Sequence, residues 1–139
     1  MRYALLSALL LAACGANAAR EELPPPQLPQ RTGVDPIVAA RAEGVEFRAV
    51  GDGFVLDIFR EERIRLTLTA TGEELIFPKP EPRYPRWFGS IYFTTQEGRV
   101  LSIVIRNDHP CERADRATYP IEVELRLDDR EMEGCGREF

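Results

Sequence analysis

The side chains best suited to chemistry are few and scattered along the 139-residue chain. The single histidine, His109, lies two residues before Cys111, and this pair would give a metal ion only two ligands. Ser90 and Ser102 are the serines beyond the N-terminal segment, and neither lies in a G-x-S-x-G pattern. Lys79 is the only lysine. We therefore expect no enzyme activity, no catalytic residue, no cofactor and no metal site.

Paired carboxylates are the other candidates for acid–base chemistry. Glu61-Glu62, Glu73-Glu74 and Asp128-Asp129 all fall at expected turns, where solvated charge is the simpler interpretation. A glycosidase would need two carboxyl groups facing each other across a cleft, which spacing alone does not indicate. Acidic residues outnumber basic ones by 23 to 18, giving a net charge of −5, and this disfavours a nucleic-acid partner.

The first 13 residues have the features of a secretory signal peptide. Arg2 supplies a positive charge, and the apolar stretch that follows is too short to span a bilayer. The run Leu11-Ala12-Ala13-Cys14 resembles the bacterial lipobox. This resemblance implies cleavage before Cys14 and attachment of fatty acids, such as palmitate, to that residue. The alternative is an ordinary secreted protein cut after Ala18, with Cys14 discarded.

Residues 14–35 are expected to form a lipidated tether that is rich in proline and polar side chains. Gly15 follows the cysteine, where an Asp would signal retention in the inner membrane. By analogy with other lipoproteins, we expect the periplasmic face of the bacterial outer membrane, with the membrane contacted only through the lipid anchor.

Residues 36–139 are expected to form one mainly β domain. Asp35-Pro36 and Gly44 have the residue types that begin and end a helix, so a short helix is predicted over residues 37–43. Two segments alternate apolar with polar residues, and their predicted inward positions are Ile64, Leu66, Leu68 and Ala70 in the first and Ile121, Val123, Leu125 and Leu127 in the second. Less regular strands are expected over 45–50, 53–60, 74–78, 88–95, 99–106 and 131–137. Eight short strands with tight turns predict an antiparallel meander, closed into a small barrel or strongly rolled.

Lipidation of Cys14 would leave Cys111 and Cys135, an even number in an oxidising periplasm. We expect a structural disulfide that fixes the last strand to the loop over residues 107–118. A metal or reactive-thiol site with His109 is the alternative. Cys135 is out of phase with Met132, so a β-bulge at Gly134 is also expected.

Two groups of motifs resemble a family of small, uncharacterised bacterial envelope proteins with an F-R-A-x-G-x-x-P-F-W pattern near the start of the domain. The matching residues are Phe47-Arg48-Ala49-Val50-Gly51 at the start, and Cys111, Asp115, Tyr119-Pro120 and Gly134-Cys135 towards the end. The chain has Asp52-Gly53-Phe54-Val55 where the family has its Pro-Phe-Trp element. Because no activity is established for the family, the resemblance implies a fold and an envelope location only.

The best binding candidate is the proline-rich segment 78–87, which contains Arg83, Tyr84, Arg86 and Trp87. Arginine and aromatic side chains are enriched where proteins recognise partners. Alternatively, Tyr84 and Trp87 fold back and plug one end of the barrel. A second, weaker candidate is the loop over 107–120, which contains His109, Glu112, Arg113, Asp115 and Arg116.

These features together predict a non-catalytic binding or structural module, with an envelope protein or a glycan as its partner. One alternative is a barrel that carries a small apolar ligand, but inward positions rich in Leu, Ile, Val and Phe favour a filled interior. Another is a lysozyme-inhibitor-like protein. Such inhibitors have a Ser-Gly-x-Gly-like loop, for which Phe88-Gly89-Ser90 is a poor substitute.

Overall fold

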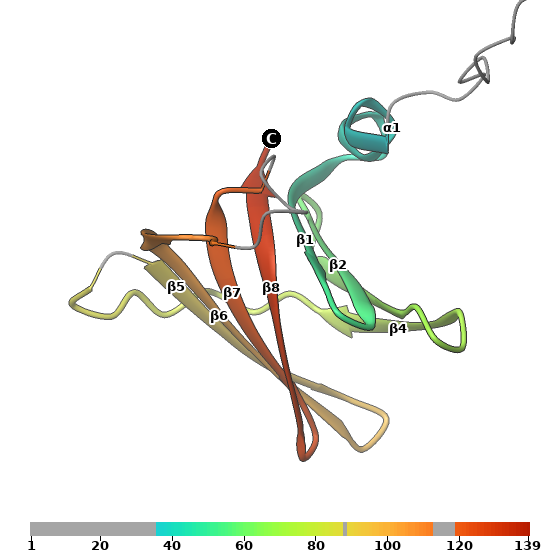
Figure 1. The fold of residues 1–139 in the computed structure, drawn as a ribbon. Helices are drawn as coiled ribbons and strands as arrows, with labels where there is room; N and C mark the ends of the chain where they lie inside the picture. Colours follow the sequence, from blue (N-terminus) through green and yellow to red (C-terminus); the bar gives the residue numbers. More distant parts are fainter. Residues whose placement is uncertain (1–35, 88, 113–118) are drawn as a thin grey trace, which may run out of the picture. The chain divides into compact units, whose positions relative to one another are not determined.

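The computed structural model describes residues 36–87, 89–112 and 119–139. The predicted signal peptide, Cys14, the tether and Asp35 lie outside the described residues. One short helix precedes eight antiparallel strands that form a nearly closed, barrel-like sheet (Figure 1). The elements are α1 (Pro36–Ala42), β1 (Val45–Gly51), β2 (Phe54–Phe59), β3 (Arg63–Leu68), β4 (Glu73–Pro78), β5 (Gly89–Gln96), β6 (Arg99–Pro110), β7 (Ile121–Leu127) and β8 (Arg130–Glu138). The predicted fold class is therefore confirmed.

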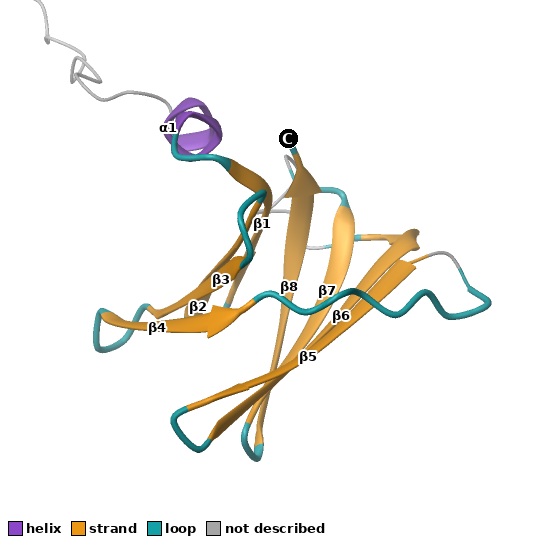
Figure 2. Ribbon diagram, turned by 180° about the vertical axis from the view of Figure 1, so that it is seen from behind, coloured by secondary structure: helices purple, strands orange, loops and turns teal. Residues whose placement is uncertain are grey.

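Pairing of the first strand with the last curls the sheet. The strand order is β4-β3-β2-β1-β8-β7-β6-β5, so that β1 pairs with β8 from Phe47↔Glu138 to Gly51↔Gly134. Strands β4 and β5 are thus the two edges of the sheet and face each other where the barrel stays open (Figure 2). No helix in the described part of the chain is long and apolar enough to cross a membrane.

One face of the sheet forms the core of the domain. Alternation along each strand places apolar side chains on the inner face, where burial removes them from water. The buried cluster comprises Phe47, Ala49, Phe54, Leu56, Ile58, Ile64, Leu66, Leu68, Phe77, Tyr92, Leu101, Ile103, Ile105, Val123, Leu125, Leu127 and Met132. These side chains come from all eight strands, so they fill the interior.

Two glycines of β8 make room for aromatic rings inside the barrel. A Cβ built on Gly134 would lie 2.9 Å from the ring of Phe54, and one on Gly136 would clash with the ring of Phe47. Their hydrogen atoms let both rings pack directly on the backbone, and the rings replace the missing side chains. The register between β7 and β8 runs without a break from Leu127↔Arg130 to Ile121↔Gly136. The predicted bulge at Gly134 is therefore wrong.

The short helix covers part of the outer face of the sheet. Ala40 of α1 packs with Val45 and Phe59, and all three side chains are buried. Gly44 has φ of +88° and its N–H donates to the carbonyl of Arg41 at 3.1 Å, which ends the helix as predicted. The helix begins at Pro36, the residue expected at its first position, and ends at Ala42, one residue before the expected end.

Two further expectations need correction. Ala70 was expected on the inner face, but β3 ends at Leu68 and Ala70 is exposed in the turn that follows. Residues 107–110 were expected in a loop, but β6 continues to Pro110, with a shift in its pairing to β7 between Arg106 and Pro110. Alternation alone gives no signal for a strand that continues past a register shift.

Candidate functional site

The proline-rich segment, residues 79–87, connects the two edges of the sheet. Pro78, which the sequence placed in this segment, is the last residue of β4. At the start of the segment, Lys79 Nζ donates to the Phe59 carbonyl at 2.9 Å and forms an ion pair with Glu46. In its middle, Arg83 and Ile91 exchange two backbone hydrogen bonds of 2.9 Å. The segment is therefore tied to the barrel at its start and again at its centre.

At its other end, Trp87 lies against the outer face of β5 and β6. The guanidinium carbon of Arg106 lies 4.9 Å from the centroid of the Trp87 ring, within the range of a cation–π contact. The same guanidinium donates to Glu124 at 3.0 Å. A Cβ on Gly89 would clash with the Trp87 ring, so only glycine admits the ring at this position. Trp87 therefore packs on the side of the barrel.

The other three candidate residues are exposed. Tyr84 is 77% exposed, the largest exposed fraction among the described large apolar side chains that lie on the surface. Arg83 and Arg86 flank it and are also exposed. The structure thus divides the four candidates: Trp87 packs against the barrel, while Arg83, Tyr84 and Arg86 face solvent.

Beside Tyr84, the start of the proline-rich segment forms one wall of a surface hollow of about 350 Å³. Its lining also includes Glu46, Lys79 and Tyr92, together with Pro80 and Pro82. Burial raises the pKa of the Tyr92 hydroxyl, because the charged phenolate would lose hydration. At neutral pH this hydroxyl is a neutral donor and acceptor. The hollow therefore combines two aromatic side chains with mixed charge, a composition that suits a polar peptide or sugar.

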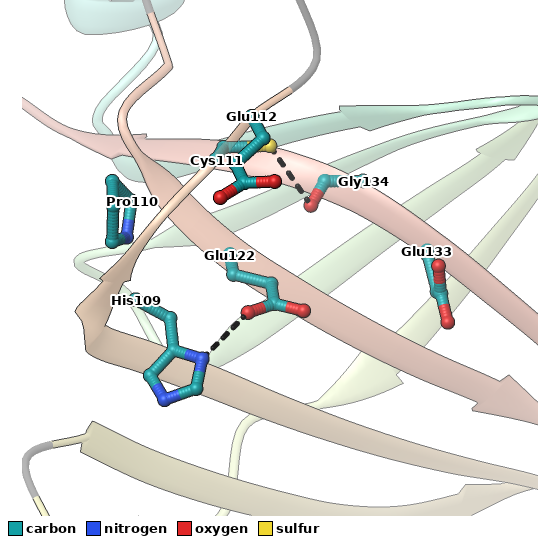
Figure 3. Close-up of a pocket in the computed structure, with 7 residues that line it drawn as sticks. All are labelled: His109, Pro110, Cys111, Glu112, Glu122, Glu133 and Gly134. Atoms are coloured by element: carbon teal, nitrogen blue, oxygen red, sulfur yellow. Dashed lines mark hydrogen bonds and ion pairs between the residues drawn. The ribbon is translucent and has the colours of Figure 1, made fainter.

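The second candidate region, around His109, forms a hollow of about 370 Å³ (Figure 3). His109 Nδ1 lies 3.2 Å from a carboxylate oxygen of Glu122, and Cys111, Glu112 and Glu133 complete the wall. Across the described residues, no group of three or more His, Cys, Asp or Glu side chains has the geometry of a metal site. Arg113, Asp115 and Arg116 lie outside the described residues.

Cys111 and Cys135 meet at disulfide distance, with Cα atoms 5.6 Å apart. Cys135 is fully buried on the outer face of β8, and Cys111 follows the end of β6. The N–H of Cys111 donates to the carbonyl of Pro120 at 2.8 Å, next to the start of β7. The Cys111–Cys135 pairing predicted from the sequence is therefore present. Because its sulfur is bonded to Cys135, Cys111 has no free thiol beside His109.

An arginine–aspartate–arginine cluster on the outer face of β1, β2 and β3 was not identified from the sequence. Asp57 is only 2% exposed and lies directly across from Arg48 and Arg65 in the register. Its carboxylate accepts bonds of 2.6 and 2.9 Å from Arg48 and of 2.7 and 3.2 Å from Arg65. Hydrogen bonding to Asp57 raises the pKa of Arg48. Arg65 also donates to Glu43, the residue after α1, at 3.0 Å, so the cluster links the end of the helix to the neighbouring strands β1, β2 and β3 by charged hydrogen bonds of the folded chain.

Gly89 and Ser90, proposed as a poor substitute for an inhibitory loop, belong to β5. They therefore lie in the sheet instead of projecting from it, and Phe88 lies outside the described residues. No family model, curated protein or solved structure matches the chain.

Proposed function

We propose that this protein is a lipid-anchored envelope module that works by surface contact, without catalysis, on the periplasmic face of the bacterial outer membrane. The anchor would be Cys14, and the contact surface would be the exposed part of the proline-rich segment. The partner would be an envelope protein or a glycan.

The observation that carries this proposal is the placement of Tyr84. Its ring is exposed, yet the segment that bears it is bound to the barrel by Lys79, by the Arg83–Ile91 pairing and by the packing of Trp87. A segment whose backbone is held in place before binding loses less conformational entropy when a partner arrives. Arg83 and Arg86 on either side can donate to carboxylate or hydroxyl groups. Exposed aromatic and arginine side chains of this kind often dominate binding energies.

Because the interior is filled, we favour binding at the surface rather than binding of a ligand inside the barrel. A carrier of a small apolar ligand needs a cavity of several hundred Å³, whereas the inner face carries a continuous cluster of buried side chains from every strand. The two hollows described above are open to solvent and are not enclosed cavities.

The contact surface can be tested by comparing variants that leave the barrel intact. The full-length protein and a Tyr84→Ala/Arg86→Ala variant would be isolated with their bound partners after mild cross-linking of the envelope. Val38→Ala is the matched control, because Val38 is an exposed apolar side chain on α1. We expect partner recovery to fall at least tenfold in the double variant and to stay unchanged in the control. Equal recovery from all three proteins would contradict the proposal.

The anchor is tested separately by mass spectrometry of the detergent-extracted mature protein. We expect the N-terminal peptide to begin at Cys14 and to carry diacylglyceryl and acyl groups. A peptide that begins at unmodified Ala19 would overturn the lipoprotein assignment.

A further inference from the structure

The open side of the barrel, between the facing edges of β4 and β5, has unused pairing capacity. Within the described residues, no ladder joins these strands. One side-chain hydrogen bond links them: the hydroxyl of Thr94 donates to the carbonyl of Pro78 at 2.8 Å. Beyond that point the two strands diverge towards their turns (Figure 2). A hollow of about 300 Å³ lies there, lined by β4 residues 74–77 and by Gln96, Glu97 and Arg99.

The register shows which backbone groups face this open side. The N–H of Lys79 donates to the carbonyl of Glu62, so alternate residues before it, Phe77 and Leu75, direct their backbone groups towards β3. Ile76 and Glu74 therefore direct theirs into the opening. This leaves the N–H and C=O of two successive edge positions available to a further strand.

The same reasoning applies to β5. Ile91 exchanges its N–H and C=O bonds with Arg83, across the edge. Phe93 and Thr95, two and four residues further on, therefore present their backbone groups to the same opening. The proline-rich segment thus occupies one part of the β5 edge and leaves the part nearest the β5–β6 turn uncovered.

Apolar side chains accompany these free backbone groups. Ile76 is 47% exposed on β4, and Phe93 is 58% exposed on β5. Val100, 36% exposed, lies opposite Thr95 on β6. Together they account for three of the five large apolar side chains exposed within the described residues. An added strand would shield them from water as it forms backbone bonds.

The negative charge around the opening favours a positively charged peptide. The side chains of Glu73, Glu74 and Glu97 are exposed, and among the described residues none of them forms an ion pair. Among the residues that line this hollow the cation is Arg99, which is paired with Asp128 at 2.6 Å. Parallel, in-register pairing of two copies of β4 would bring their Glu73 and Glu74 side chains together, and like charges at an edge oppose such pairing.

We propose that the edge of β4 binds an extended peptide segment of another protein, in which apolar residues alternate with Lys or Arg. The peptide adds a strand to β4 at Glu74 and Ile76. Its cations then lie on the outer face, beside Glu74 and near Glu97, and its apolar side chains lie on the inner face, beside Leu75 and Phe77. This edge is separate from Tyr84 and from the anchor, so the inference does not depend on the function proposed above.

The test uses the detergent-solubilised full chain and a capped octapeptide of alternating lysine and valine. Hydrogen exchange followed by mass spectrometry reports protection of the backbone. We expect the peptide to slow exchange in fragments that cover residues 73–78 and to leave fragments of β7 unchanged. A peptide of alternating glutamate and valine keeps the backbone and the apolar groups, and we expect at least tenfold weaker binding from it.

Two variants complete the design. Ile76→Lys adds a like charge at the edge and should weaken binding of the lysine–valine peptide at least tenfold, while Val38→Lys should bind as the unmodified protein does. Far-ultraviolet circular dichroism checks that both variants stay folded. Absence of protection at residues 73–78 at millimolar peptide, or equal binding of the two peptides, would overturn the proposal. So would self-association that Ile76→Lys abolishes, because the occupant would then be a second copy.

Discussion

Replacement of Asp57 by asparagine should destabilise the protein more than any other single substitution on the outer face of the sheet. The side chain keeps its size, but its negative charge is lost between two guanidinium groups that lie within 3.2 Å of the carboxylate. The two arginines would then face each other with like charge. In addition, the new amide N–H₂ group would point at one of them, so at least one arginine would lose a hydrogen bond to residue 57, although Arg65 keeps its ion pair with Glu43 at 3.0 Å.

The magnitude follows from burial. Removal of one partner from a fully buried ion pair costs about 3–5 kcal/mol. Asp57 is 2% exposed, but the side chains of Arg48 and Arg65 are 15% and 22% exposed and keep part of their hydration. We therefore expect the lower end, a loss of about 3 kcal/mol in the free energy of unfolding. For a domain of this size, that corresponds to a fall of about 12 °C in Tm.

The assay is urea denaturation at neutral pH, followed by circular dichroism and by the fluorescence of Trp87. Glu131→Gln is the matched control, because its ion pair with Arg126 is long, at 3.8 Å, and both side chains are exposed. We expect no measurable change in that variant. A triple variant, Asp57→Leu with Arg48→Met and Arg65→Met, removes all three charges and should recover most of the stability. A loss below about 1 kcal/mol in Asp57→Asn would refute the reasoning, because removal of the central charge from a buried cluster should destabilise the protein by more than this.

Three further predictions concern other parts of the sheet. Reduction of the Cys111–Cys135 disulfide, which joins residues 24 positions apart, should lower the free energy of unfolding by roughly 3.5 kcal/mol in the chain-entropy model, and an unchanged urea midpoint with reductant would contradict it. Gly136→Ala places a methyl group against the ring of Phe47 and 2.9 Å from a methyl of Val123, so thermal unfolding should show a cost of about 1–3 kcal/mol; a variant as stable as the parent would show that the ring is free to move away. The backbone N–H of Val100 and then the side chain of Arg99 lower the pKa of Asp128, so this group's contribution to stability is present above the ordinary carboxyl range and is lost as pH falls through the lowered value. Asp128→Asn should therefore reduce stability at neutral pH and show a flatter decline below about pH 4, and parallel curves for both proteins would contradict this.

Much of the fold follows from local patterns that the sequence displays directly. Alternation at Ile64–Leu68 and at Ile121–Leu127 defines strands because each has one apolar and one polar face. Gly98 and Gly72 have positive φ in their turns, as their position between predicted strands required. Ala70 extends the alternating pattern beyond the end of the strand, because a small apolar side chain can also be exposed in a turn with little loss of stability.

Contacts between distant residues were harder to predict. Asp57 interrupts an otherwise apolar stretch, and its importance depends on register, which places Arg48 and Arg65 directly across from it. Pairing of the predicted strands through their turns could have indicated this cluster. Trp87 depends on Gly89 and Arg106 being adjacent across β5 and β6, a relation that composition alone does not contain. The open side between β4 and β5 depends on closure of the whole sheet.

The surface-contact proposal is tested most directly by site-specific photo-cross-linking in intact cells. A photoreactive phenylalanine analogue would replace Tyr84 in one strain and Val38, exposed on α1, in another. The account predicts a discrete cross-linked species from position 84 that is absent from position 38 and that competes with excess unmodified protein. No adduct from position 84, or the same adducts from both positions, would contradict it.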